Sequence, residues 1–352
     1  MYQRKSRICC VLMLTVSICL RICMLLGLDA KAAAALASAA SQPEFARWML
    51  FLETGKVANV EETPDKPQLW ILKVEQEPLP APEPPTEEPI PEPEPEPEPL
   101  PAVTPVSADA ITVTGGCTYA YDKAALLAQP STLDFSGEGP HILIVHTHGS
   151  EAYTQTAATT YTAVEPYRTL DSARSVIAVG QALAEALESH GFSVIHDTAV
   201  NDYPSYNDSY WTTLQRIEQW KAQYPSLQMV IDVHRDAVED DFGKAVALSA
   251  QAAGEDCARL MLVVGTDQGG LNHPGWRENL SNALKLQSVL EAMAPGLCRD
   301  LDLRTERFNQ HVTPGSILVE VGTNGNTLEQ ALRSAAILAD GLAQTVLLQQ
   351  NQ

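Results

Sequence analysis

Two kinds of hydrophobic pattern alternate along the chain from about residue 110 onwards. Short apolar runs, typical of buried strands, occur at residues 141–146, 192–196, 227–234, 260–265 and 317–321. Between them, apolar residues recur every three or four positions, as on one face of a helix, at residues 172–190, 214–224, 276–293 and 328–348. Because predicted strands and helices alternate, the sequence indicates an α/β domain with a mostly parallel sheet and helices on both faces.

The first 30 residues have a different pattern, in which positive charges precede a long apolar run. Residues 8–28 form a mostly apolar run in which Arg21 is the only charged residue. About 20 apolar residues suffice to cross a bilayer as a helix, so we expect a single-pass N-terminal membrane anchor. The alternative is an export signal that is cleaved at the small residues that follow. In both cases the positive flank stays in the cytoplasm and the rest of the chain lies outside it.

Two segments separate this anchor from the α/β domain, which we place at residues 110–352. Residues 31–76 mix apolar and charged positions and are predicted to form an extracytoplasmic juxtamembrane region. Residues 77–105 contain 13 of the 24 prolines and eight of the 44 acidic residues, a composition that favours an extended polyproline II linker. Part of the net charge of -21 therefore belongs to a linker. Since no Lys/Arg-rich face is visible, nucleic acid is not an expected partner.

The cysteines do not suggest a metal site. Outside the first apolar segment the chain has Cys117, Cys257 and Cys298, far apart and without a CxxC or Cys/His spacing. Isolated cysteines in odd number argue against a disulfide framework, so we expect unpaired thiols.

Polar residues follow three of the predicted strands, at the ends where α/β sheets carry their ligand sites. These segments are residues 145–151, 231–236 and 318–324. Two strand-end histidines and Glu320 suit a zinc hydrolase, in which the metal keeps a position open for water and a carboxylate takes the proton of that water. A third protein ligand is required, and Glu151 and Asp171 are the candidates. A non-metal module that binds carbohydrate or peptide is the alternative.

Six longer motifs resemble those of the stage II sporulation protein P family. They occupy residues 144–153, 167–171, 230–237, 265–274, 304–311 and 314–326. The motifs occur in the same order as in that family, and the resemblance covers residues 110–350. An N-terminal anchor followed by a variable linker is also similar to the organisation of the family.

The resemblance implies the fold and activity of zinc N-acetylmuramoyl-L-alanine amidases of the amidase_3 type, with an additional endopeptidase activity on stem-peptide cross-links. By their place in the motifs, His148 and His234 correspond to the two zinc histidines and Glu320 to the catalytic glutamate. The third zinc ligand stays open between Asp171, near the start of the first helix, and Glu151, within the first motif.

The resemblance also implies a substrate, partners and a location. Peptidoglycan of the septal wall is the expected substrate, remodelled during engulfment of the forespore together with stage II sporulation proteins D and M. Arg304 and His311 are expected to line the substrate groove and Arg235 to meet a stem-peptide carboxylate, with structural ion pairs as the alternative. The expected location is the outer face of the cell membrane. A non-catalytic peptidoglycan-binding scaffold is the alternative function.

Overall fold

The computed structural model describes residues 100, 102–252 and 254–350. The predicted anchor (1–30), the predicted juxtamembrane region (31–76) and residues 77–99 of the predicted linker lie outside the described residues. The folded unit includes Val106, whose amide donates a hydrogen bond to the Ser288 carbonyl, 3.1 Å away.

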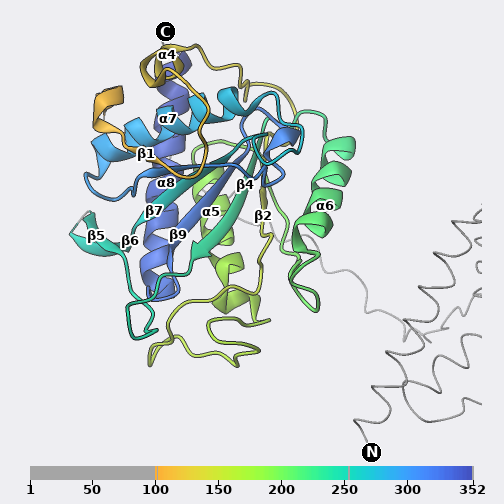
Figure 1. Ribbon diagram of the computed structural model, residues 1–352, viewed down its shortest axis with the longest axis vertical. Helices are drawn as coiled ribbons and strands as arrows, with labels where there is room; N and C mark the ends of the chain where they lie inside the picture. The colour runs from red at the N-terminus through yellow and green to blue at the C-terminus, as the bar shows by residue number, and fades with distance from the viewer. Residues whose placement is uncertain (1–99, 101, 253, 351–352) are drawn as a thin grey trace, which may run out of the picture. The chain divides into compact units, whose positions relative to one another are not determined.

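A seven-stranded sheet forms the centre of this unit, with the strand order β1-β8-β7-β9-β4-β2-β3 (Figure 1). Its strands are β1 (Val113–Thr114), β2 (Ile142–Val145), β3 (Val194–His196), β4 (Met229–Asp236), β7 (Leu260–Gly265), β8 (Leu301–Arg304) and β9 (Ile317–Thr323). Five of the six neighbouring pairs are parallel, and the pair of β7 with β9 is antiparallel. The predicted, mostly parallel α/β sheet is therefore confirmed.

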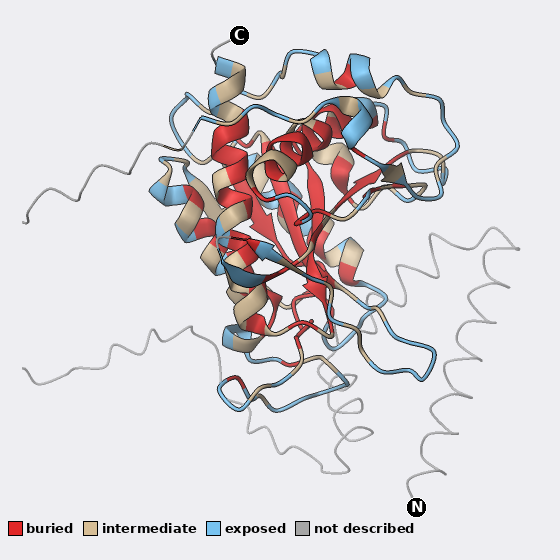
Figure 2. Ribbon diagram, turned by 90° about the vertical axis from the view of Figure 1, so that its left-hand side faces the viewer, coloured by how far each residue is buried: buried red, intermediate tan, exposed pale blue. Residues whose placement is uncertain are grey.

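Helices cover both faces of the sheet, as predicted. The main ones are α5 (Val176–Ser189), α6 (Ser209–Gln223), α7 (Trp276–Met293) and α8 (Leu328–Gln350). Successive side chains of a strand point to opposite faces. Ile231 and Val233 of β4 belong to the core shared with α5, α7 and α8, whereas Val230 packs with Ile217 of α6. Figure 2 shows the strands and the inner sides of the helices buried and the loops exposed.

Smaller elements complete the unit and were not predicted from the sequence. They are the helix α4 (Lys123–Ala128), the hairpin of β5 (Ser249–Ala252) and β6 (Glu255–Ala258), the edge strand β1 with its neighbour β8, and the 3₁₀ turns η1 (Ala108–Ala110), η2 (Ser172–Arg174) and η3 (Gln310–Val312). Most are two to four residues long, too short for a hydrophobic period to emerge. The four predicted helices and five predicted strands are all present, and α7 has the predicted bounds.

The C-terminal helix α8 is long and apolar enough to cross a membrane by length and composition, but 61% of its most apolar window is buried inside the domain. It is therefore the central helix of a folded core, where it packs against both α5 and α7. The three cysteines of the domain, Cys117, Cys257 and Cys298, are free thiols, as expected.

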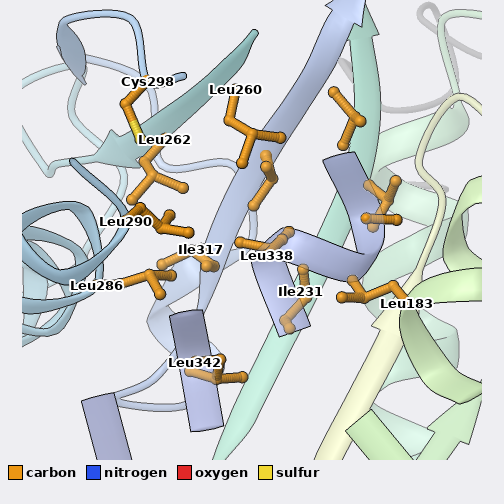
Figure 3. Close-up of a cluster of buried hydrophobic side chains, with 14 of the residues drawn as sticks. Leu183, Ile231, Leu260, Leu262, Leu286, Leu290, Cys298, Ile317, Leu338 and Leu342 are labelled. Carbon is orange, nitrogen blue, oxygen red and sulfur yellow. The ribbon is translucent and has the colours of Figure 1, made fainter. Parts of the chain in front are cut away.

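Close packing between α7 and α8 depends on a glycine. Figure 3 shows Leu286 and Leu290 of α7 beside Leu338 and Leu342 of α8 in the buried cluster. A Cβ atom added at Gly341 would lie 2.4 Å from Cδ2 and 2.9 Å from Cγ of Leu290. Leu290 is fully buried, and side chains in a close-packed core move aside only at a cost.

We predict that Gly341→Ala destabilises the domain. Alanine favours a helix over glycine by about 1 kcal/mol, but the clash with Leu290 forces the two helices apart, which costs roughly 1–3 kcal/mol in a packed core. Urea unfolding should show a net loss of stability. A second change, Leu290→Ala, should make the Gly341→Ala substitution less harmful than it is in the wild-type background.

The control is Gly275→Ala, at the start of α7, where an added Cβ has no neighbour within 4 Å. That variant should stay within about 0.5 kcal/mol of wild type. Equal or greater stability of Gly341→Ala would show that α7 and α8 do not need this close approach.

Candidate catalytic and metal site

Two of the predicted site residues lie side by side on neighbouring strands. His234 of β4 and Glu320 of β9 are register partners in a parallel pair. Both occupy strand positions whose side chains alternate with Val233 and Val319 of the main core, so they point to the face that α6 covers. Both were predicted at strand ends, and the two strands run two residues further than predicted, to Asp236 and Thr323, so His234 and Glu320 lie within them. The site is consequently built on the rigid face of the sheet.

His148 reaches the same place from the loop that follows β2. Its ring centroid is 5.2 Å from that of His234, at an interplanar angle of 84°. The loop is held by Asp232, which accepts hydrogen bonds from the backbone N–H and the hydroxyl of Thr147. Burial and the positive charge of His234 lower the pKa of His148 to about 4. His148 is therefore neutral near pH 7, the form that binds metals.

Glu151 joins this group and is buried with it. Its Oε2 lies 3.5 Å from Nδ1 of His234 and accepts a hydrogen bond from the Arg235 N–H at 3.2 Å. Its Oε1 lies 3.5 Å from Nη2 of Arg168. Burial alone would raise the pKa of Glu151, but the hydrogen bond to His234 and the charge of Arg235 outweigh it and hold the pKa at about 2. Glu151 is thus an anion in the middle of the cluster.

Asp171 lies apart from the cluster. Its side chain is exposed and accepts a hydrogen bond from the Ala173 N–H, as the N-cap of the short turn η2. Of the two candidates for the third ligand, the structure brings Glu151 to the histidines and leaves Asp171 at the surface.

His234 is held between two carboxylates. Its Nε2 lies 3.0 Å from Oδ1 of Asp232, although the angle is not that of a hydrogen bond, and its Nδ1 faces Glu151. Burial lowers the pKa of His234, but the two carboxylates outweigh burial and raise it well above its usual value. The imidazolium of His234 thus balances part of the negative charge at this place.

Glu320 has the opposite electrostatic character. Its Oε2 is shielded from solvent and has no hydrogen-bond partner, although the residue as a whole is only half-buried. Burial of the carboxyl group raises the pKa of Glu320 to about 8; the charge of His234 opposes this shift and that of Glu151 adds to it. A carboxyl group that gains or loses a proton near neutral pH is suited to general acid–base chemistry.

The donor set suits zinc in its chemistry. Nδ1 of His148 is buried without a hydrogen-bond partner, Nδ1 of His234 lies beside Glu151, and Glu151 is ionised. Two histidines and one carboxylate are a common set of ligands for catalytic zinc. Among the described residues, however, no group of three or more His, Cys, Asp or Glu side chains is already arranged around a common metal position. Binding would require these side chains to reorient and His234 to give up its proton, since only the neutral imidazole binds a metal.

The three predicted substrate contacts have different positions. Arg235 is buried and donates to the carbonyls of Ala152 and Tyr167, so it fixes the loop behind Glu151. Arg304 is ion-paired with Asp302 and Glu306, at 3.3 and 3.4 Å. Both arginines thus have structural partners, and their contacts with substrate stay a prediction. His311 lies in η3, outside the His148–His234 cluster, with its ring centroid 6.5 Å from that of His273.

Several residues of the site were not predicted. Tyr206 stacks on His148 with 4.4 Å between ring centroids, and Tyr210 meets the same ring edge-on at 5.6 Å. Arg168 lies over the ring of Tyr206, 4.9 Å from its centroid, and is ion-paired with Asp202. The three tyrosines at 203, 206 and 210 were a usable signal, because aromatic residues are unusual in so polar a segment.

A cavity of about 380 Å³ adjoins the cluster on the α6 side. Tyr210 forms part of its wall, opposite residues of the loops that follow β7 and β8: Gly269, Leu271, Thr305, Glu306, Arg307, Phe308 and Asn309. Nearby His273 is buried, and burial together with the positive charges of His311 and Arg307 lowers its pKa to about 4, while Asp267 opposes the shift.

This fold and site define a class of protein, an α/β protein with a buried histidine–carboxylate cluster on one face of its sheet. The sequence pattern of the family described as Stage II sporulation protein P (SpoIIP) matches residues 72–343. The chain belongs to this family.

Single proteins that are similar to the chain share about a quarter of its residues or fewer in the aligned part. Stage II sporulation protein P of Bacillus subtilis (strain 168) is 26% identical over 216 residues, which are 58% of this chain and 51% of that protein, so the match spans about half the length of the relative. Among solved structures, N-acetylmuramoyl-L-alanine amidase AmiC2 of Nostoc punctiforme is 14% identical with a TM-score of 0.35, over 61% of this chain and 100% of that chain. The CwlD amidase from Clostridioides difficile, in complex with the GerS lipoprotein, is 14% identical with a TM-score of 0.34, over 60% and 98%.

Zinc content should separate the two candidate ligands. We expect Asp171→Ala to hold zinc like the wild-type chain, because its carboxylate only caps a turn. Glu151→Ala should lose affinity by more than the roughly 10- to 100-fold typical of a residue that merely supports a ligand. Inductively coupled plasma mass spectrometry after dialysis against limiting zinc measures both.

Glu151→Gln is the structural control, since its amide oxygen still accepts the Arg235 N–H while the ligand charge is removed. It should also lose zinc, with the fold retained. Full zinc occupancy in Glu151→Ala, or an equal loss in Asp171→Ala, would contradict this assignment.

The buried His273 should make the domain less stable in acid. Its pKa is about 4 in the folded chain and about 6.5 in an unfolded one. The unfolded state therefore binds the proton first, and stability falls as the pH drops from 6.5 towards 4. In His273→Gln, the loss of unfolding free energy between pH 7 and pH 5 should be smaller than in wild type by about 1–2 kcal/mol. An unchanged pH dependence would show that His273 is protonated without penalty.

Proposed function

We propose that this chain is a zinc-dependent peptidoglycan hydrolase that cleaves the amide between N-acetylmuramic acid and L-alanine, in remodelling of the septal wall and engulfment of the forespore during sporulation. The observation that carries the proposal is the pairing of His234 with Glu320 on adjacent strands, with His148 and Glu151 beside them. Membership of the sporulation family supports the substrate and the setting.

His148, His234 and Glu151 are the residues that would hold the metal. When bound, zinc supplies a Lewis acid that polarises the scissile carbonyl and activates water. Asp232 supports this role of His234, because a carboxylate beside one ring nitrogen fixes the orientation of the ring and leaves the other nitrogen for the ligand bond.

Glu320 carries the proton in the proposed reaction. It accepts a proton from the attacking water at its carboxylate and returns it to the nitrogen of the leaving amine. The environment that brings the pKa of Glu320 towards neutral pH suits both steps, since a group titrating near the working pH can both take up and release a proton. Its place within β9 holds the carboxyl group rigidly against the reacting amide.

Tyr206 and Tyr210 form the wall of the site that faces α6. Tyr206 is about half exposed while its ring covers one face of His148. The proposed role of both rings is to limit the access of bulk water to the cluster and to hold the imidazole of His148 in one orientation.

We further propose that the same site also cleaves stem-peptide cross-links, that the chain is held at the outer face of the membrane by its N-terminal segment, and that it works with stage II sporulation proteins D and M. The support for these points is membership of the family and the apolar pattern of residues 8–28.

The decisive experiment is the variant Glu320→Gln, which keeps the shape of the side chain and removes the proton acceptor. Turnover of purified peptidoglycan, followed by mass spectrometry of the released stem peptides, should fall by roughly 100-fold or more. Zinc content and thermal stability should remain close to those of the wild-type chain, because Glu320 does not hold the metal in this proposal.

Two outcomes would sink the proposed mechanism. Loss of zinc from Glu320→Gln would make this residue a ligand, and near-normal hydrolysis would exclude it as the proton carrier. Removal of the metal with a chelator should abolish hydrolysis by the wild-type chain, and added zinc should restore it. A wild-type chain that binds peptidoglycan but never cleaves it, with zinc present, would be a scaffold.

A further inference from the structure

Two motifs far apart in the sequence form one structural unit beside the site. The segment at residues 265–274 packs along the segment at residues 304–311, with hydrogen bonds from the Thr266 N–H to the Glu306 carbonyl and from the Gly269 N–H to the Thr305 carbonyl. A Cβ atom at Gly265 would lie 2.3 Å from the Glu306 oxygen, and one at Gly269 would lie 2.7 Å from the Thr305 oxygen. The two backbones are therefore too close for any side chain at these glycines.

Buried amide side chains fix this unit in place. Gln310 accepts from the Gly265 N–H and donates to the Val263 carbonyl, at 2.8 and 2.9 Å. Asn279 of α7 donates to the carbonyls of Gln310, Thr313 and Ser316. Asn309 donates to the Tyr210 carbonyl at 2.8 Å, which ties the loop to the start of α6. The loop is thus preorganised and not a free surface segment.

The backbone of this loop is strained where it faces α6. Phe308 and Asn309 are consecutive non-glycine residues in the left-handed region, with φ of 48° and 59°. Such a conformation costs free energy and persists where the surrounding structure enforces it, often at binding sites. Here it places Phe308 against Tyr210, with 5.9 Å between ring centroids.

The cavity between this loop and Tyr210 is next to the proposed reaction centre. Tyr210 lines the cavity and also contacts the ring of His148. Leu271 and Phe308 supply apolar walls, and Leu271 is largely exposed. A substrate bound at His148 could therefore extend past Tyr210 into the cavity.

Arg307 brings to the cavity a positive charge without an ion-pair partner among the described residues, and the carboxylate of Glu218 acts on it only from beyond ion-pair distance. Its Nε is buried and has no hydrogen-bond partner, and its Nη1 makes one long bond, 3.3 Å, to the Asn272 carbonyl. Within the described part of the chain no carboxylate is ion-paired with Arg307, whereas Glu306 on the same wall is already paired with Arg304. His273 is neutral at pH 7, so it does not compete for an anion. A guanidinium with a free edge in a rigid cavity is a typical binding group for a carboxylate.

We infer that this cavity is a subsite for a carboxylate of the stem peptide and that Arg307 is the residue that recognises it. The inference rests on the proposed function, since it assigns a part of the same substrate to a place next to the same cluster. In this arrangement the peptide part of the substrate, and not its glycan part, lies over the loop of residues 304–311.

The test uses two short stem peptides that begin with free L-alanine and differ only in whether their carboxyl groups are free or amidated. They lack the muramoyl amide, so the proposed reaction cannot consume them. Isothermal titration calorimetry with the full wild-type chain should show tighter binding of the free-carboxylate peptide. Arg307→Gln should weaken that binding by roughly 10- to 100-fold and leave the amidated peptide unaffected.

Arg307→Lys keeps the charge but not the fork of donors, and should recover part of the binding. Arg333→Gln is the matched control for loss of one positive charge. Arg333 lies on α8 and contacts Glu255 and the Asp256 carbonyl, away from the cavity, so its variant should bind both peptides like wild type. In hydrolysis assays, Arg307→Gln should raise KM for the free-carboxylate substrate, with kcat little changed.

Equal binding of both peptides by wild type, no binding of either, or an equal loss of both in Arg307→Gln would overturn the inference. The inference would also be overturned if the chain preferred a glycan fragment without peptide and Arg307→Gln weakened the binding of that fragment. The proposed function can fail while the inference holds. A chain that binds the free-carboxylate peptide through Arg307 but never cleaves the muramoyl amide would have the subsite without the proposed hydrolase activity.

Discussion

The parallel pairing of β4 with β9 is the constraint on which the rest of the site depends. Its register sets His234 directly beside Glu320 on the face covered by α6, and a shift of one residue would turn one of them into the apolar core. The other groups then follow from the neighbouring strand. β2 pairs with the opposite edge of β4, so the loop after β2 brings His148 and Glu151 to His234 from the other side. The site is thus a property of three adjacent central strands.

The electrostatics of this cluster are those of a surplus of carboxyl groups around few cations. Glu151, Asp232 and Glu320 share the space around one imidazolium, with Arg235 behind Glu151. His234 and Arg235 together keep the pKa of Glu151 low, and His234 with the hydrogen bonds from Thr147 lowers the pKa of Asp232, while Glu320 remains the group with the raised pKa. Like charges at close range cannot all ionise, so burial and the hydrogen-bond partners of each carboxyl group separate the roles of these chemically similar groups.

The sequence predicted the fold better than the site. Long segments with a clear period, such as α7, were predicted with the correct bounds, whereas β8 was missed because four residues with alternating charge carry little signal. A hydrophobic pattern also carries no information on strand direction, so the reversal of β7 against β9 could not be foreseen. The choice between Glu151 and Asp171 was open because Glu151 lies in the first motif with His148, whereas Asp171 lies near the start of the first predicted helix. It depends on side-chain direction in folded loops, which Arg235 and the N-cap of η2 set.

The place of β9 in the sheet also determines when the sheet can be completed during folding. β9 is the last strand in the sequence, yet it lies between β7 and β4 in the middle of the sheet, and the helix after it fills the core. Strands made earlier in synthesis must therefore wait, with unpaired edges, for the final segment of the chain. Assembly of such long-range contacts is intrinsically slow, and Glu320 cannot meet His234 before it is complete. A chain that stops before β9 consequently lacks Glu320 beside the other residues of the cluster, so the proposed chemistry requires synthesis to proceed through β9.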